Sequence, residues 1–264
     1  SKNALEDAGI KATDVDLIIV GTTTPDDTFP ATAVKVQRYL EVKGGAAFDI
    51  QAACSGFIYA LSIADNMIRA RQIDTALVVG ADTLTKLLDW NDRTTCPLFG
   101  DGAGAVVLQG QKINNEDKPS GILSTHLHSD GNLRDILYCE SDLVVDNKAH
   151  KIQMDGREVF RHAVTNLSDV ALEALAANNL KEADIDWLVP HQANKRIIDN
   201  TAKRLKLSAD KIVLTIDSHA NTSAASIPLA LDVAIKDGRI QSGHLLLMEA
   251  IGGGLTWGAA LVRW

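Results

Sequence analysis

The sequence predicts an α/β protein made of two similar halves, and three observations support this prediction. Short apolar runs bounded by turn residues alternate with segments of helical periodicity along the chain. The same order of segments occurs twice, at an offset of about 167–170 residues. With 264 residues and 46% apolar content, the chain can bury a large core, as one big domain or as two fused halves.

The first half opens on the end of a helix that closes at Gly9. Further helices are expected at 31–40 and 57–71, and strands at 16–21, 46–51, 74–81 and 100–108. The polar segment 112–120 is a plausible seam, which gives predicted halves of 1–111 and 112–264. The strand that opens the second half has no counterpart in the first, so we expect about 50 residues ahead of Ser1.

The second half repeats this order after its extra strand at 121–128. Helices are expected at 158–177, 194–205 and 223–236, and strands at 186–189, 212–217, 245–250 and 254–262. His126 and His128 would share one face of the first of these strands. Since no third ligand lies nearby in the sequence, a satisfied or solvent-facing pair is a better prediction than a metal site.

The composition excludes several classes of function. A net charge of −8 argues against generic binding to nucleic acid or to anionic membranes, because both require a basic surface. The three cysteines, none in a Cys-x-x-Cys pair, predict neither a disulfide scaffold nor a structural zinc site, and they fit a reducing cytosol. No apolar run approaches the roughly 20 residues of a membrane span, and no signal peptide is visible.

Cys54 lies in a predicted strand–turn–helix, after the strand at 46–51 and just before Gly56. A cysteine at a helix N-terminus meets partial positive charge from unpaired backbone N–H groups, which favours the thiolate. The small residues around it would let a substrate approach closely. From this stretch alone, a buried structural cysteine is an equally good interpretation.

Two polar residues of the second half point to a reactive cysteine. The turn at 218–226 corresponds to the Cys54 turn and would place Asn221 opposite Cys54 if the halves pack about a two-fold axis. His191 follows the strand at 186–189, at the carboxyl end where open α/β sheets bind ligands. A thiolate can take an acyl group from a thioester while backbone N–H groups stabilise the oxyanion. A neutral His and an Asn amide can both donate to a second thioester carbonyl and so stabilise an enolate, without a metal.

Four separated motifs carry a family resemblance that covers essentially the whole chain. They are Ala52–Phe57, Val189–Asn194, His219–Ser226 and Gly252–Gly258, and together they resemble bacterial β-ketoacyl-[acyl-carrier-protein] synthase III. The resemblance implies the thiolase fold, with two repeats in a five-layered arrangement, and a cytoplasmic homodimer without a cofactor. It also implies condensation of an acyl-CoA primer, usually acetyl-CoA, with malonyl-acyl-carrier protein, which initiates type II fatty acid synthesis.

The resemblance assigns the catalytic roles residue by residue. Cys54 resembles the acyl-accepting nucleophile, and His191 and Asn221 resemble the pair that supports malonyl decarboxylation and condensation. The backbone N–H groups of Cys54 and Gly253 would form the oxyanion hole. The pairing of His with Asn is what separates this family from the elongating ketoacyl synthases, which use two histidines.

The resemblance also implies binding positions around this centre. Arg93, Asn194 and Gly156 match positions along the coenzyme A tunnel, and Phe29 resembles the aromatic that reaches the partner subunit's pocket. Phe99 and Leu84 look like lining of the primer pocket, although both could simply be core residues.

A local basic surface in an acidic protein suggests an acidic partner such as an acyl carrier protein. Arg196 and Lys203 are seven residues apart and share a helix face, Arg204 lies beside them, and Arg161 matches another such position. A solvated helix face is the alternative.

Two positions depart from the family pattern. Ala220 replaces the usual glycine between His219 and Asn221, and Ile251 replaces the usual phenylalanine before the three glycines. The second change would reshape the acyl pocket, so we expect tolerance of primers slightly longer than acetyl. Two alternatives stay open: a related synthase that loads a specialised primer for a secondary metabolite, and a truncated, inactive relative that binds carrier protein.

Overall fold

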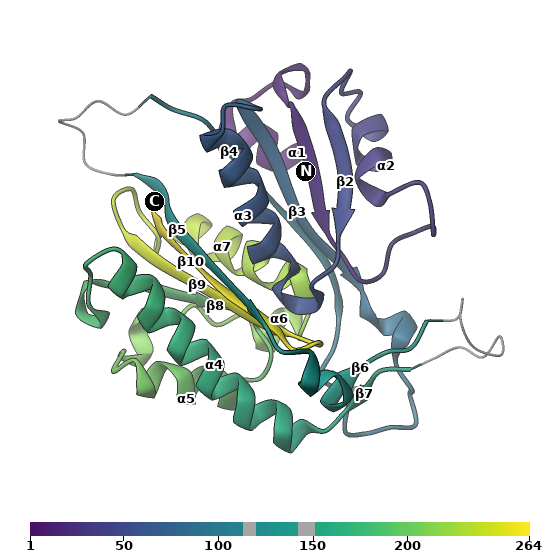
Figure 1. Ribbon diagram of the computed structural model, residues 1–264, viewed down its shortest axis with the longest axis vertical. Coiled ribbons are helices and arrows are strands. Elements are labelled where there is room, and N and C mark those ends of the chain that lie inside the picture. Colours follow the sequence, from purple (N-terminus) through teal and green to yellow (C-terminus); the bar gives the residue numbers. More distant parts are fainter. Residues whose placement is uncertain (113–119, 142–150) are drawn as a thin grey trace.

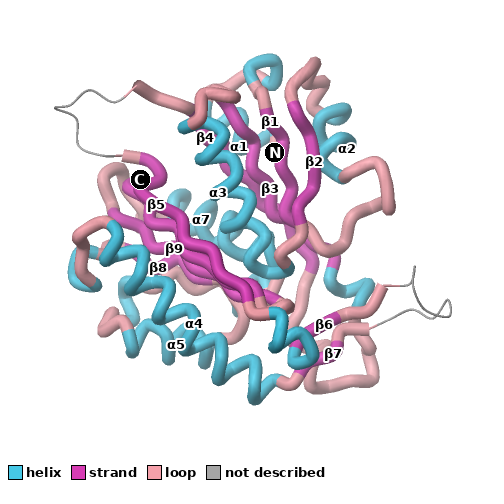
Figure 2. Tube along the Cα trace, in the orientation of Figure 1, coloured by secondary structure: helices cyan, strands magenta, loops and turns pink. Residues whose placement is uncertain are grey.

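The computed structural model describes residues 1–112, 120–141 and 151–264. Two four-stranded sheets face each other, with two helices between them and helices on both outer faces (Figure 1). Figure 2 shows the same layers, with helices on either side of the strands of both sheets. The five-layered α/β arrangement predicted from the sequence is confirmed.

The first half supplies one sheet in the order β2-β1-β3-β4, in which only β4 runs antiparallel to its neighbour. All five residues of β1 are buried, as expected for an apolar strand covered on both faces. The elements of this half are α1 (Lys2–Ala8), β1 (Leu17–Gly21), α2 (Thr32–Tyr39), β2 (Ala46–Ile50), α3 (Gly56–Arg69), β3 (Thr75–Thr83) and β4 (Asp101–Gln109).

The second half supplies the other sheet in the order β5-β10-β9-β8, and a separate two-stranded hairpin of β6 and β7. The first strand of this sheet, β5, has no counterpart among the described residues of the first half. The elements are β5 (Gly121–Ser129), β6 (Leu137–Tyr138), β7 (Gln153–Met154), α4 (Gly156–Ala177), β8 (Trp187–Pro190), α5 (Lys195–Arg204), α6 (Ile216–His219), α7 (Ser226–Lys236), β9 (Leu245–Gly252) and β10 (Thr256–Arg263).

The internal repeat is confirmed at the level of strand register. Leu17 pairs with Ala76 in the first sheet, and the residues 170 positions later, Trp187 and Leu246, pair in the second. The carboxylate of Asp16 accepts the backbone N–H groups of Asp74 and Thr75, and that of Asp186 accepts the N–H of Leu245 in the same way. The two halves therefore start their central strands with the same side-chain cap.

The buried apolar residues form separate clusters between adjacent layers. Residues of α3 and α7 pack between the two sheets in the largest buried cluster, which includes Phe57 and Ile227. A second cluster lies between α4, α5 and the second sheet, and a third between α1, α2 and the first sheet. Because helices cover both faces of each sheet, the chemistry can only be reached where the strands end.

One predicted strand, 212–217, is wrong. The structure has only an isolated bridge between Leu188 and Ile212 there, followed by α6. The reason lies at the end of β8, where Pro190 has no N–H to continue the pairing. The Gln192 amide takes its place: Nε2 donates to the Val213 oxygen (3.1 Å) and Oε1 accepts the Thr215 N–H (2.9 Å).

The proposed seam between halves falls mostly at 113–119, outside the described residues, so the division at residue 112 stays a prediction. Among the helices that the structure describes, none combines the length and the apolar character needed to traverse a bilayer.

Candidate active site

Cys54 occupies the middle of a 3₁₀ turn, Ala53–Ser55, which runs directly into α3. Ala53 adopts a left-handed φ of 46°, so the turn holds a conformation that non-glycine residues rarely adopt. The Ser55 hydroxyl fixes it by donating to the Ala52 oxygen (2.6 Å), and it also bonds the Thr256 hydroxyl (2.8 Å). The sequence prediction of a cysteine at a helix start is confirmed.

The electrostatic expectation for Cys54 needs correction. Burial raises the pKa of the thiol to about 12, because the thiolate loses its hydration. The Ser223 side chain opposes this rise by hydrogen bonding to the sulfur, whereas the negative charge of Asp82 adds to it. Desolvation is the largest influence on this pKa, and the resting residue is a thiol.

His191 follows β8 and is 3% exposed. Its Nδ1 lies 2.6 Å from the Ser226 hydroxyl, and its backbone N–H donates to the Glu249 oxygen (2.7 Å). Burial lowers the pKa of the imidazole to about 3, so the ring is neutral at physiological pH. A neutral ring whose Nδ1 faces a hydroxyl can carry its proton on Nε2 and act as a hydrogen-bond donor.

Asn221 is buried in the second-half turn, before the 3₁₀ turn Ser223–Ala225. Its Oδ1 accepts the Ser223 N–H (2.9 Å), and its backbone N–H and oxygen bond to Leu98 and Gly100. With the side-chain oxygen engaged, the Nδ2 group remains as the donor.

The second-half turn brings the three predicted catalytic residues together. The Ser223 side chain lies close enough to the Cys54 sulfur to lower its pKa, and the Ser223 backbone N–H donates to Asn221 Oδ1. Ser226, which contacts His191, begins α7 directly after the same turn. Cys54, His191 and Asn221 therefore surround one short segment, although they come from three distant parts of the sequence.

Gly252, the last residue of β9, packs against the backbone of the Cys54 turn. A Cβ at Gly252 would stand 2.5 Å from the Cys54 nitrogen, so only glycine permits this close approach. Gly253 follows directly, and a Cβ there would meet the Leu137 oxygen at 2.7 Å. Among the loop and turn hydrogen bonds of the described residues, none joins the N–H of Cys54 or of Gly253 to a backbone oxygen. Two such donors close together suit an oxyanion hole.

The residues predicted to bind substrate lie at different depths. Phe99 is at the site, since it forms a backbone bridge with Asn221. Leu84 is buried at the start of the 3₁₀ turn Leu84–Leu87, after β3, and Arg93 is exposed in the loop that follows. Phe29 is 83% exposed.

Three further predictions concern the second half. Asn194 caps α5, where its Oδ1 accepts the Arg196 N–H (2.9 Å), and Gly156 is the exposed first residue of α4. Ile251 packs into the cluster with Leu167 and Ile197, on the face of β9 covered by α4 and α5. A role for Ile251 in the acyl pocket stays a prediction.

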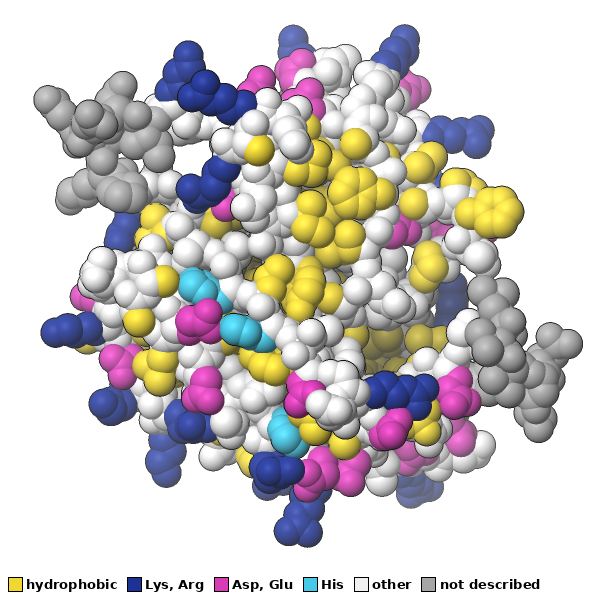
Figure 3. Space-filling model, in the orientation of Figure 1, with side chains coloured by type: hydrophobic (Ala, Val, Ile, Leu, Met, Phe, Trp, Pro, Cys, Tyr) yellow, Lys and Arg dark blue, Asp and Glu magenta, His cyan; other side chains and the backbone are white. Residues whose placement is uncertain are grey.

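The predicted carrier-protein residues form an uneven basic surface on α4 and α5. Arg161 pairs with Glu158 (2.6 Å), and the Arg196 guanidinium stands over the neighbouring Phe160 ring. Arg204 turns back to α4, where it pairs with Asp169 (3.6 Å), while Lys203 stays exposed on the other side. Figure 3 shows Lys and Arg side chains over α4, interspersed with acidic ones.

His126 and His128 share one face of β5, as predicted, and both contact Glu173 of α4, at 3.0 and 2.6 Å. Trp257 stacks on His128. Within residues 1–112, 120–141 and 151–264, no group of three or more His, Cys, Asp or Glu side chains is arranged to hold a metal ion. The prediction of a satisfied pair is confirmed.

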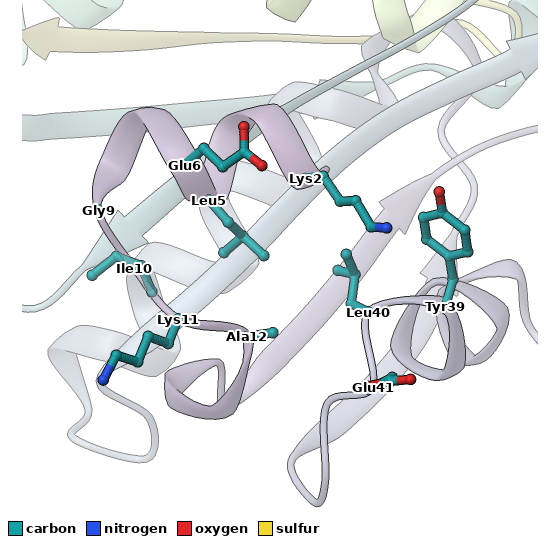
Figure 4. A pocket seen from close by; sticks show the side chains of 10 residues that line it. All are labelled: Lys2, Leu5, Glu6, Gly9, Ile10, Lys11, Ala12, Tyr39, Leu40 and Glu41. Carbon is teal, nitrogen blue, oxygen red and sulfur yellow. The ribbon is translucent and has the colours of Figure 1, made fainter.

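A surface hollow of about 510 Å³ lies between α1 and the end of α2 (Figure 4). Lys2 extends toward the Tyr39 ring, 4.4 Å from its centroid. Because α1 and α2 cover the outer face of the first sheet, this hollow is separate from the Cys54 site.

Comparisons with known proteins agree with this geometry. Two family models match, 3-oxoacyl-[acyl-carrier-protein] synthase III over residues 48–131 and its C-terminal counterpart over residues 175–264. A β-ketoacyl-[acyl-carrier-protein] synthase III from Paramagnetospirillum magneticum is 61% identical over 260 residues, which is 98% of this chain and 80% of the relative. The chain belongs to this family. It is therefore a condensing acyltransferase with a thiolase-like fold, as predicted.

Solved structures give the same answer. The 3-oxoacyl-[acyl-carrier-protein] synthase III of Aquifex aeolicus is 47% identical with a TM-score of 0.92, over 100% of this chain and 82% of that chain. The priming β-ketosynthase of the R1128 polyketide pathway has the same TM-score at 35% identity, over 99% of this chain and 78% of that chain.

Sequence reasoning missed the residues that hold the catalytic groups. Ser223 and Ser226 contact Cys54 and His191, and nothing in the sequence distinguishes them from the other residues of the turn at 218–226. Asp82 and Glu249 lie in strands, 3% and 0% exposed, and neither was singled out. A carboxylate at the end of a long apolar run is an unusual pattern, and that signal could have found both.

Glu249 adds a buried carboxyl group next to the site. Neither of its carboxyl oxygens has a hydrogen-bond partner among the described residues. Burial raises the pKa of this carboxyl to about 8, so it is mostly protonated at neutral pH.

Proposed function

We propose that this chain condenses an acetyl or other short acyl group from coenzyme A with malonyl-acyl-carrier protein, and so initiates fatty acid synthesis. The observation that carries the proposal is the single turn around which Cys54, His191 and Asn221 meet. The names of the relatives supply the reaction class.

In the first half-reaction, the Cys54 sulfur attacks the primer's thioester carbonyl. The oxyanion of the tetrahedral intermediate accepts hydrogen bonds from the N–H groups of Cys54 and Gly253. The bond to the coenzyme A sulfur then breaks, and the thiol proton of Cys54 ends on coenzyme A. A thiol with a pKa near 12 must lose its proton in the course of this attack rather than before it.

In the second half-reaction, the malonyl group loses CO2 and its bonding electrons move onto the thioester oxygen. His191 Nε2–H and Asn221 Nδ2–H stabilise this enolate as neutral donors, which requires no metal or redox cofactor. The enolate carbon attacks the acyl-Cys54 carbonyl. Collapse of the second tetrahedral intermediate releases the Cys54 thiolate and the 3-oxoacyl-carrier protein.

The test runs the two half-reactions in sequence. Incubation with acetyl-CoA should add one acetyl group to the peptide that contains Cys54, and malonyl-carrier protein should then yield the ketoacyl product. Folded protein that gains no acetyl group would favour the inactive carrier-binding alternative. A primer panel separates the remaining alternative: we expect acetyl-CoA to be used together with slightly longer primers. Strong preference for acetyl-CoA over C4–C6 acyl-CoAs would contradict this tolerance.

The carrier protein is proposed to dock on the basic surface of α4 and α5, with Arg93, Gly156 and Asn194 along the coenzyme A path. Arg196 suits this role because it is exposed and has no carboxylate partner among the described residues. Arg196→Glu should raise the KM for malonyl-carrier protein about tenfold while leaving acylation by acetyl-CoA unchanged. An unchanged KM would remove Arg196 from the interface.

A cytoplasmic homodimer is also proposed, with its interface at the β2 edge of the first sheet. There the edge strand β2 is flanked by exposed Phe29 and Tyr39. Sedimentation should give twice the mass of the chain, and Phe29→Ala should weaken that association. A monomer at micromolar concentration would contradict it.

A further inference from the structure

The turn that carries Asn221 has the backbone of the Cys54 turn, 170 residues later. Ala53 and Ser223 both adopt a left-handed φ, at 46° and 54°, and each begins a 3₁₀ turn that leads directly into a helix. By this correspondence Ala224 stands where the first turn has Cys54, and Thr83 stands where the second half has Gly253. The N–H groups of Ala224 and Thr83 are thus a second copy of the candidate oxyanion hole.

This second pair of donors is occupied by side chains of the first half. The Ala224 N–H donates to Asp82 Oδ2 at 3.4 Å, and the Thr83 N–H donates to the Thr24 hydroxyl at 2.8 Å. The Thr24 hydroxyl in turn donates to Asp82 Oδ1 at 3.0 Å. The first copy, at Cys54 and Gly253, is open instead.

Asp82 is held firmly in this place. It is 3% exposed at the end of β3, and its Oδ1 accepts the Thr23 N–H (2.8 Å) and the Thr22 and Thr23 hydroxyls (3.2 and 2.9 Å). Several donors compensate the desolvation of a buried carboxylate, and removing it would leave them unpaired. The carboxylate therefore joins the 22–24 turn, the end of β3 and the second-half turn.

We propose that Asp82, together with the Thr24 hydroxyl it accepts, fills the second copy of the oxyanion hole, and that Asp82 is thereby the positioning residue for Ser223 and Asn221. Ala224 directly follows Ser223, whose N–H donates to Asn221 Oδ1 and whose side chain reaches Cys54. A left-handed conformation at Ser223 needs anchoring on both sides, because it is strained for a side chain with a Cβ. Asp82 supplies the anchor on the Ala224 side.

The test compares Asp82→Asn, which removes the charge but keeps the shape, with Asp16→Asn. Asp16 is a matched control, since its carboxylate also accepts two backbone N–H groups, at the opposite end of the same sheet. The first readout is the pH profile of Cys54 alkylation by iodoacetamide. Of the ionisable groups near the sulfur, Asp82 on β3 carries charge, His191 after β8 is neutral, and Glu249 on β9 is mostly protonated until the pH approaches 8. Asp82→Asn should move the profile about half a pH unit toward acid, and Asp16→Asn should not move it.

The second readout is malonyl decarboxylation, which rests on the proposed role of Asn221. Asp82→Asn should lower kcat about tenfold with KM within about twofold, because the enolate donor is misplaced while binding contacts are kept. If Asp82→Asn does not fold, Thr24→Val keeps the charge and removes one link, and its kcat should fall about threefold.

Alkylation profiles and decarboxylation rates that coincide in Asp82→Asn and Asp16→Asn would overturn the proposal, as would an unchanged kcat in Thr24→Val. Failure of the wild type to decarboxylate malonyl thioesters would instead count against the proposed function. The alkylation readout is independent of that outcome.

Discussion

The Cys54 turn and the Ser223–Ala225 turn share one backbone but divide the chemistry between them. The first presents a thiol and free N–H groups, whereas the second presents Asn221 and has its N–H groups bonded to Asp82 and Thr24. The internal repeat thus supplies two copies of one turn with a pair of backbone N–H groups, and the surrounding side chains determine which copy reacts.

The strands beside these turns differ in the same way. His191 and Ser226 correspond to Gly21 and Gly56 of the first half, where a Cβ at Gly21 would stand 2.7 Å from the Gly56 backbone. Two glycines therefore let β1 and α3 touch, while the second half opens the same space for an imidazole and a hydroxyl. The comparison teaches that the halves are complementary rather than redundant.

The largest effect on activity should come from replacing Cys54, the residue that distinguishes the first turn from the second. Cys54→Ser should lower acyl transfer from acetyl-CoA by about 10³-fold or more, because a serine hydroxyl is a much weaker acid and a poorer nucleophile than a thiol. Cys96→Ser is the matched control, a free cysteine of the same exposure class in the loop before β4, and it should transfer acyl groups normally. Peptide mass spectrometry distinguishes the two. Acylation of the Cys54→Ser protein at another cysteine would break the comparison.

The residues that distinguish the second turn should affect the other half-reaction. His191→Ala and Asn221→Ala should each lower malonyl decarboxylation by about 10²–10⁴-fold, because each removes a donor to the enolate. Acylation of Cys54 should be spared in both, as measured with labelled acetyl-CoA. Equal loss of both half-reactions in Asn221→Ala would contradict the division of labour.

A smaller effect, on the pH dependence of the unfolding free energy, should distinguish Glu249 from its first-half counterpart, the buried Val79. The folded pKa of Glu249, about 8, lies above its ordinary value of 4.5, so the folded state holds a proton that the unfolded state releases. Its contribution to stability is therefore present below about pH 4.5 and lost as pH rises toward 8.

Glu249→Gln removes this dependence. Relative to wild type, the variant should gain a few kcal/mol of unfolding free energy between about pH 5 and pH 8, measured by urea denaturation. A stability difference that stays constant with pH would show that the carboxyl does not titrate in this range.

The smallest effect should come from placing a thiol in the second turn. Ala224→Cys in the Cys54→Ser protein puts sulfur at the corresponding position, but the N–H groups there are bonded to Asp82 and Thr24. No acylation by acetyl-CoA is expected above that of Cys54→Ser alone. Acylation at position 224 would show that occupied N–H groups at Ala224 and Thr83 do not prevent reaction, and it would contradict the proposed difference between the two turns.

The sequence predicted the fold well because apolar runs, helical periodicity and the repeat agree with each other. Cys54 and His191 were found because each closes a strand at the edge where ligands bind. The prediction of a strand at 212–217 was wrong for a local reason. Pro190 interrupts the backbone pairing there, and the Gln192 side chain completes it. Hydrophobic periodicity does not reveal where a side chain replaces backbone pairing between strands.

The site was predicted less completely than the fold. The raised pKa of Cys54 could not be foreseen, because burial depends on how Gly252 and Ser223 close around the turn. Asp82 was missed for a related reason: its donors lie 58–60 residues away in the 22–24 turn and 142 residues away at Ala224. Contacts between the halves exist only once both are folded.

The central claim is that the first turn reacts and the second turn assists. It is tested most directly by tryptic mass mapping after incubation with acetyl-CoA, before and after addition of malonyl-carrier protein. The account predicts one acetyl group on the peptide that contains Cys54, which disappears on the second addition as ketoacyl product forms. An unmodified Cys54, or an acetyl group that persists when malonyl-carrier protein is present, would contradict it.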